Sequence, residues 1–147
     1  MKRFALWLAA AIAALQCSAT FAGELGTGKE ARAMLDRAVA EMKKDSNAAI
    51  AKFNKGEDGF RDRDLYVFCA TPDGITTAHP THVGTNLKTL KDKKGKAFGA
   101  EMFKVAREGR VSRVTYMWPK PGSDTPVAKV TYVTKVAHQI CGVGYYK

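Results

Sequence analysis

Two histidines with two residues between them form the densest group of chemically active side chains in this 147-residue chain. In the segment His79-Pro80-Thr81-His82, either imidazole can bind a metal ion or donate a hydrogen bond to an anion. A metal site needs three or four ligands in a defined geometry, and the third histidine, His138, lies far away in the sequence. The sequence therefore predicts no metal site. Pro80 keeps His79 extended, which leaves His79 either as a donor to a carboxylate ligand or as an ordinary loop histidine.

The cysteines offer a second kind of chemistry. Cys69 and Cys141 both lie in apolar, strand-like segments, and Cys17 lies near the N-terminus. Their spacing contains no Cys-x-x-Cys pattern, so redox and zinc motifs are absent from the sequence. Cys69 and Cys141 either form a disulfide, if the compartment is oxidising, or remain buried thiols.

Motifs for catalysis and for nucleic-acid binding are missing from the sequence. It has no Gly-x-Ser-x-Gly elbow, no Walker loop and no dinucleotide-binding glycine pattern, so we expect neither an enzyme nor a bound cofactor. The net charge is +10, but the densest lysine stretch, residues 88–96, has no interleaved aromatic residues. That arrangement argues against a nucleic-acid platform and favours a solvated basic surface.

The first residues have the pattern of an export signal. Lys2 and Arg3 precede an apolar run over residues 4–15, which is shorter than the roughly 20 residues that a membrane span needs. Small residues favour cleavage after Ala22, or alternatively after Ala19. The sequence thus predicts a signal peptide at 1–22 and one domain at 23–147, periplasmic or secreted. The alternative is an uncleaved segment that anchors the domain in the inner membrane.

The rest of the chain predicts an α+β domain. A capping box at Thr27 and Glu30 begins a long helix over residues 28–55, which the segment 45–47 interrupts and Gly56 ends. Strands are expected at 65–70, 75–78, 111–118, 129–136 and 139–146, and a second helix from residue 98 to about Gly109. Short links between the last three strands favour an antiparallel meander. The expected fold is an antiparallel sheet of about five strands with the long helix packed on it.

Five segments in this order resemble the single Cache domains of bacterial extracytoplasmic sensors, in particular their second type, which is close to the PAS architecture. They are AKFN at 51–54, DLYVF at 64–68, HP at 79–80 with GTNL at 84–87, YMWPKPGSDTPVAKVTYV at 116–133, and GVGYYK at 142–147. The sequence differs from the family where a Gly-Trp pair often precedes the aromatic strand, because residues 111–114 read Val-Ser-Arg-Val. One wall of a ligand pocket is therefore expected to differ.

The resemblance implies a pocket for a small organic acid between the sheet and its loops. A carboxylate needs a cation and hydrogen-bond donors in a partly dry site, and Lys129 matches the family's lysine. The expected ligand-binding residues are Lys129, Tyr116, Trp118, Tyr132, Tyr66, Phe68 and His79. Each has a plain alternative, since the lysine could be solvated at a strand end and the aromatic residues could be core. Tyr132 is three residues from Lys129, which puts the two on opposite faces unless a bulge intervenes.

In this architecture the first and last strands are neighbours, which would bring Cys69 and Cys141 within bonding distance. The resemblance implies an extracytoplasmic sensor of a short organic carboxylate that serves chemotaxis or signal transduction. Because the sequence shows no second hydrophobic segment, the expected partner is a membrane receptor or sensor kinase. The alternative is a periplasmic interaction protein with a degenerate pocket that docks on a membrane partner, as the missing Gly-Trp pair would allow.

Overall fold

The computed structural model describes residues 24–147, so the predicted signal peptide at 1–22 lies outside the described residues. The helical elements are α1 (Gly28–Lys44), α2 (Ser46–Lys55), η1 (Glu57–Gly59), η2 (Leu87–Thr89) and α3 (Phe98–Val105). The strands are β1 (Arg61–Asp62), β2 (Leu65–Ala70), β3 (Thr76–Ala78), β4 (Ser112–Pro119), β5 (Pro126–Val136) and β6 (Gln139–Tyr146). Within this range no helix combines the length and the apolar character that a membrane crossing requires.

Local capping explains why the predicted long helix is two helices. Thr27 and Glu30 form the capping box that begins α1. Asp45 ends α1 in an extended conformation, and its side chain accepts a hydrogen bond from the backbone N–H of Ala48 at the start of α2. Gly56, with φ of 69°, then ends α2 in the left-handed conformation that glycine adopts without steric cost. The chain therefore reverses at Asp45, and α2 packs beside α1.

All strand pairs are antiparallel, in the order β1-β2-β6-β5-β4, with β3 also paired to β2. This confirms the predicted α+β fold. The sheet has six strands rather than about five, because the two-residue β1 pairs with the start of β2. Both residues of β1 are exposed, so no hydrophobic pattern marks them in the sequence. The register sets Lys129 of β5 opposite Tyr116 of β4 on one side and Tyr146 of β6 on the other.

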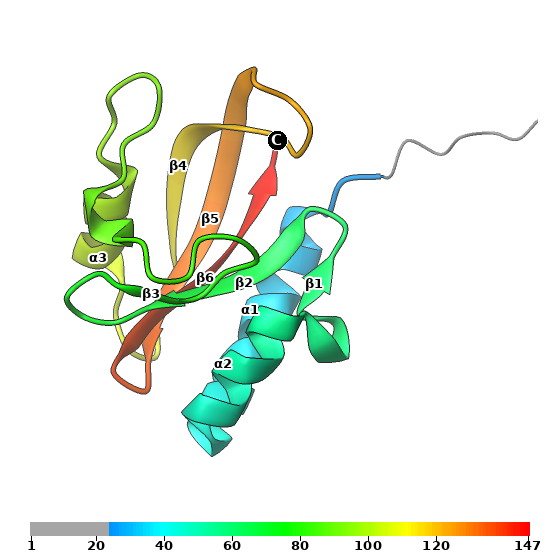
Figure 1. The fold of residues 1–147 in the computed structure, drawn as a ribbon, viewed down its shortest axis with the longest axis vertical. Coiled ribbons are helices and arrows are strands. Elements are labelled where there is room, and N and C mark those ends of the chain that lie inside the picture. The colour runs from blue at the N-terminus through cyan, green and yellow to red at the C-terminus, as the bar shows by residue number, and fades with distance from the viewer. Residues whose placement is uncertain (1–23) are drawn as a thin grey trace, which may run out of the picture.

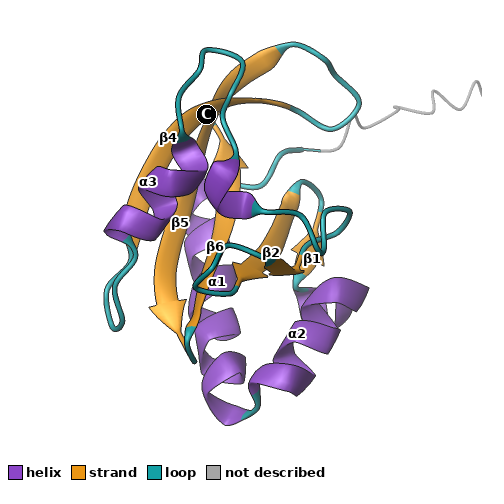
Figure 2. Ribbon diagram, turned by 60° about the vertical axis from the view of Figure 1, so that its left-hand side comes forward, coloured by secondary structure: helices purple, strands orange, loops and turns teal. Residues whose placement is uncertain are grey.

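The sheet separates two apolar clusters. One joins α1 and α2 to one face of β2 and β6, and the other joins η2 and α3 to the opposite face. Figures 1 and 2 show α3 and the long loops around it on one side of the curved sheet and α1 on the other. The helix α3 ends at Val105, before the predicted end near Gly109, because residues 107–110 leave the helix and form bridges with one another and with Lys135. Cys69 and Cys141 face α1, and their sulfurs are bonded at 2.08 Å.

Candidate functional site

A cavity of about 520 Å³ lies on the face of the sheet opposite α1. Side chains of β2, β4, β5 and β6 form its floor, and α3, η2 and the loop after β3 form its walls. Six of the seven side chains predicted to bind a ligand line this cavity. They are Lys129, Tyr116, Trp118, Tyr66, Phe68 and His79.

Among the lysine and arginine side chains that line the cavity, Lys129 is the buried one, only 3% exposed, whereas Arg61 and Arg63 are exposed. The Nζ of Lys129 lies 3.3 Å from the hydroxyl oxygen of Tyr66, 5.0 Å from the centre of the Tyr66 ring and 4.8 Å from that of Tyr146. Among residues 24–147, no carboxylate lies within ion-pair distance of it. A buried ammonium without an anion is costly, so an anionic ligand placed beside this group would lower that cost.

Gly144 makes room for this lysine. A Cβ atom at that position would lie 2.6 Å from Cε of Lys129 and 2.7 Å from Oγ1 of Thr131. Real side chains do not tolerate such contacts, so the absence of a side chain on β6 lets the lysine extend across the neighbouring strand.

Hydroxyl groups near Lys129 carry protons that no described acceptor takes up. The Tyr66 hydroxyl accepts from Lys129, and no acceptor for its own proton is found in the described part of the chain. Tyr116 Oη and Thr131 Oγ1 are 3.0 Å apart, so one donates to the other and the second keeps a free proton. The floor of the cavity therefore presents hydrogen-bond donors next to a positive charge, which suits a carboxylate.

His79 adds a further donor whose tautomer is fixed by the backbone. Its Nδ1 accepts hydrogen bonds from the N–H groups of Thr81 and His82, at 3.0 and 3.1 Å, which places the ring proton on Nε2. Asn54, at the end of α2, holds the residue in place, because its Oδ1 accepts from His79 N and its Nδ2 donates to Thr77 O, both at 3.0 Å. The imidazole then meets the Tyr66 ring edge-on, with centroids 4.8 Å apart.

Burial, and then the positive charges of His82, Lys129 and Arg61, lower the pKa of His79 to about 4. The unfolded chain has the ordinary histidine pKa of about 6.5, so it binds more protons than the folded protein between these values. We therefore expect the free energy of unfolding to fall as the pH drops from about 6.5 towards 4, with this contribution intact above that window. Urea unfolding of the wild type and of His79→Asn, whose side-chain oxygen can still accept the two backbone N–H groups, measures it.

The His79→Asn protein should lose less stability than the wild type across that pH window. His138→Asn is the matched control, because His138 is exposed and its φ of 60° is a conformation that asparagine tolerates. An unchanged pH dependence in His79→Asn would show that the folded-state pKa of this imidazole is not depressed.

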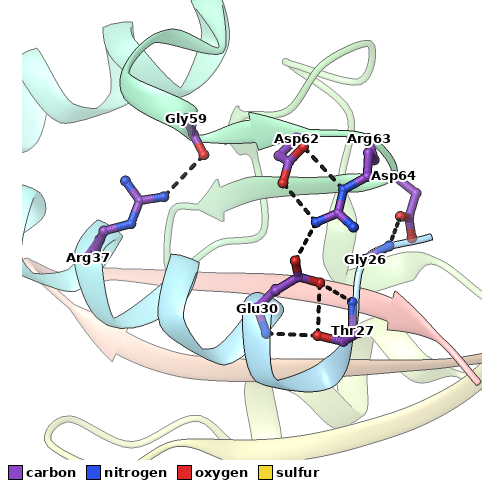
Figure 3. A network of polar contacts seen from close by, with 8 residues as sticks. All are labelled: Gly26, Thr27, Glu30, Arg37, Gly59, Asp62, Arg63 and Asp64. Carbon is purple, nitrogen blue, oxygen red and sulfur yellow. Dashed lines mark hydrogen bonds and ion pairs between the residues drawn. The ribbon is translucent and has the colours of Figure 1, made fainter. Parts of the chain in front are cut away.

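Arg63 and Asp64, which line the cavity, form polar contacts with residues at and just before the start of α1 (Figure 3). Arg63 contacts Glu30 at 2.6 Å and Asp62 at 2.9 Å, and the backbone N–H of Gly26 donates to Asp64. Hydrogen bonds from Thr27 and then from Arg63 lower the pKa of Glu30 to about 2. The charge of Arg63 is therefore already balanced by two carboxylates, and the exposed Arg61 donates to the carbonyl oxygen of Asn54. Lys129 is the buried cation of the cavity and is better placed to bind a ligand.

The structure does not place Tyr132 with the other predicted ligand-binding residues. Tyr132 lies on the α1 face of β5, where its ring stacks on that of Tyr145 with centroids 5.7 Å apart. The register of β5 against both neighbours runs without a bulge between Lys129 and Tyr132, so the odd separation puts the two on opposite faces.

Other cavity residues were not predicted from the sequence. They include Thr131 and Tyr146, which share the cavity face with Lys129, and the apolar residues Leu87, Leu90, Phe98 and Met102. Asn54 was also missed as a positioning residue, although it belongs to one of the segments that carry the family resemblance. Because side chains alternate between the two faces along a strand, Thr131, two residues after Lys129, could have been predicted to line the cavity. The described residues contain no group of three or more His, Cys, Asp or Glu side chains that could hold a metal ion.

A helix-backed antiparallel sheet with such a cavity on its other face is the PAS-like architecture of sensor domains. Residues 22–145 match the family model of Single Cache domain 2, and the chain belongs to this family of extracytoplasmic sensor domains. A methyl-accepting chemotaxis protein from Vibrio parahaemolyticus has a similar structure, with a TM-score of 0.64 and 25% identity, over 80% of this chain and 86% of that one.

Two further relatives point the same way. A second solved structure is that of a Cache chemosensory domain that recognises carboxylic acids. Its TM-score is 0.57 and it is 28% identical, over 80% of this chain and 86% of that one. The methyl-accepting chemotaxis protein McpP of Pseudomonas putida is 38% identical over 71 residues, which are 47% of this chain and 13% of that protein. The match thus spans a small part of this receptor.

Proposed function

We propose that this protein senses a small organic carboxylate, which binds in the cavity with its negative charge on Lys129. The observation that carries the proposal is the burial of the Lys129 ammonium with no carboxylate partner among residues 24–147. The solved Cache domain that recognises carboxylic acids supports the same class of ligand.

The donors around Lys129 suit a carboxylate in number and in charge. The ammonium has three N–H groups and directs one of them to Tyr66, which leaves two for a ligand. Tyr66 has a free hydroxyl proton, and His79, whose ring contacts that of Tyr66 and lines the same cavity, carries a further proton on Nε2. Two carboxylate oxygens offer about four acceptor sites, so such a ligand can satisfy these donors together.

The location and the signalling partner are part of the proposal. Residues 1–22 act as a cleaved signal peptide and the domain works in the periplasm or outside the cell, or else the same segment anchors it to the inner membrane. The liganded domain acts on a membrane receptor or sensor kinase, in keeping with the chemotaxis receptors among its relatives. A degenerate pocket is disfavoured, because the cavity is open and its donors are in place although residues 111–114 lack the Gly-Trp pair.

Ligand-induced stabilisation tests this proposal. Thermal unfolding of the exported protein is measured with a panel of monocarboxylates, each paired with its uncharged amide. An acid present at 100 times its Kd should stabilise the fold by about 2.7 kcal/mol, whereas the matching amide should have little effect because it brings no charge to Lys129. A folded sample that none of the acids stabilises would refute the proposal.

A further inference from the structure

One side of the cavity has a composition different from that of the Lys129 region. We name as the apolar lobe the six residues Phe68, Leu87, Leu90, Phe98, Met102 and Trp118, all of which line the cavity. They come from β2, η2 and the residue that follows it, α3 and β4, and they belong to the apolar cluster on this face of the sheet. The indole N–H of Trp118 is the only polar side-chain group in the lobe, so the lobe has almost nothing to offer a polar part of a ligand.

The lobe is held open by packed, rigid groups. The Phe98 ring stacks on that of Tyr116, with centroids 4.1 Å apart and planes within 4° of parallel, and meets Trp118 edge-on at 5.4 Å. A Cβ atom on Gly99 would lie only 1.9 Å from the carbonyl oxygen of Leu87, so glycine allows α3 to pack directly on η2. These contacts fix the distance between the helix and the sheet.

The size of the cavity exceeds what a carboxylate of two or three carbons needs. A cavity of about 150 Å³ with apolar walls is enough to bind benzene, and this one measures about 520 Å³. Water in an apolar lobe has few hydrogen-bond partners, so replacing it with hydrocarbon is favourable.

We infer that the natural ligand is a monocarboxylate with an apolar body, either a chain of about six carbons or a phenyl ring. The charged end binds at Lys129 and the body fills the apolar lobe. This inference rests on the proposed function for its charged end, and it adds the class of acid that the domain distinguishes from acetate or propionate.

Titration calorimetry with acetate, propionate, butanoate, hexanoate and phenylacetate tests the inference. Burial of each methylene strengthens binding about fourfold, so hexanoate, with three more than propionate, should bind roughly 50-fold more tightly. Phenylacetate should likewise exceed propionate by more than tenfold. Equal or weaker binding of the longer acids, with propionate still bound, would overturn the inference and leave the proposed function standing. If no acid of any length binds, the proposed function itself fails.

A lobe-filling variant locates the gain in affinity. Leu90→Trp places a larger side chain on the half-buried rim of the lobe, and it should reduce the advantage of hexanoate over propionate to fivefold or less. Ile75→Trp, at a 39% exposed position outside the cavity, is the matched control and should retain the full advantage of hexanoate.

If Leu90→Trp does not fold, Met102→Ala serves instead. This substitution enlarges the lobe, so the preference for phenylacetate over propionate should be greater than in the wild type. An unchanged ratio of affinities in the folded variant would overturn the assignment of the body to this lobe.

Discussion

The Lys129→Met protein should bind no carboxylate measurably and yet, without ligand, be more stable than the wild type. The reason for both effects is the position of the ammonium, which is buried beside hydroxyl groups and aromatic rings with no described carboxylate within ion-pair distance. Methionine keeps most of the apolar length of the side chain and removes the charge. The variant therefore separates what the lysine costs the fold from what it contributes to binding.

The loss of binding should be at least about 100-fold in Kd. A hydrogen bond to a charged group contributes about 1.5–3 kcal/mol, and a ligand carboxylate left in the cavity without a cation adds an uncompensated desolvation cost. In the ligand-free protein the sign is opposite, because the substitution removes the cost of burying an unpaired charge. The lost contacts with the Tyr66 and Tyr146 rings offset part of this gain, so we expect the free energy of unfolding to rise by about 1 kcal/mol.

Two measurements on one pair of variants decide the matter. Calorimetric titration measures the affinity of Lys129→Met for the acids, and urea unfolding measures its stability. Lys135→Met is the control, because it carries the same substitution on the same strand, at an exposed position outside the cavity. The control should bind as the wild type does. If Lys129→Met binds the acids as well as the wild type does, Lys129 is not part of the binding site. If the variant is less stable than the wild type without ligand, the ammonium stabilises the fold.

The cavity face of each strand was predictable wherever the chain alternates without a bulge. Tyr66 and Phe68 on β2, and Tyr116 and Trp118 on β4, share the cavity face as two-residue spacing requires. The same rule places Tyr132 with α1, and the register of β5 follows it. For Tyr132, the family resemblance suggested a ligand contact, but the strand geometry places this side chain outside the cavity.

What the sequence did not reveal depends on contacts between distant segments. Leu87, Phe98 and Met102 have the pattern of ordinary core residues, and nothing local separates a side chain that packs on atoms from one that borders a cavity. That difference is set by the approach of α3 to η2, which Gly99 permits. Likewise, the tautomer of His79 follows from two backbone N–H groups in the next turn of the loop, and its position follows from Asn54 on α2.

Reduction of the Cys69–Cys141 disulfide should destabilise the domain by about 4 kcal/mol. The two residues face each other on the paired strands β2 and β6 and are separated by 72 residues in the sequence. Closing a loop of that length lowers the entropy of the unfolded chain by an amount equivalent to about 4 kcal/mol. Domains of this size are stable by about 5–15 kcal/mol, so the bond would account for a large share of the total.

Urea unfolding with and without a reducing agent measures this effect, and the double variant Cys69→Ala, Cys141→Ala provides its control. The reduced wild type and the untreated double variant should be similarly destabilised, whereas the reductant should leave the stability of the double variant unchanged.

A count of free thiols under non-reducing conditions adds a second result, because Cys17 is the third cysteine of the chain. No free thiol indicates that the disulfide has formed and that the signal peptide has been removed, whereas one free thiol indicates a retained N-terminal segment. If reduction leaves the wild type as stable as before, the two strands are held by packing and hydrogen bonds, and the loop between the cysteines needs no covalent closure.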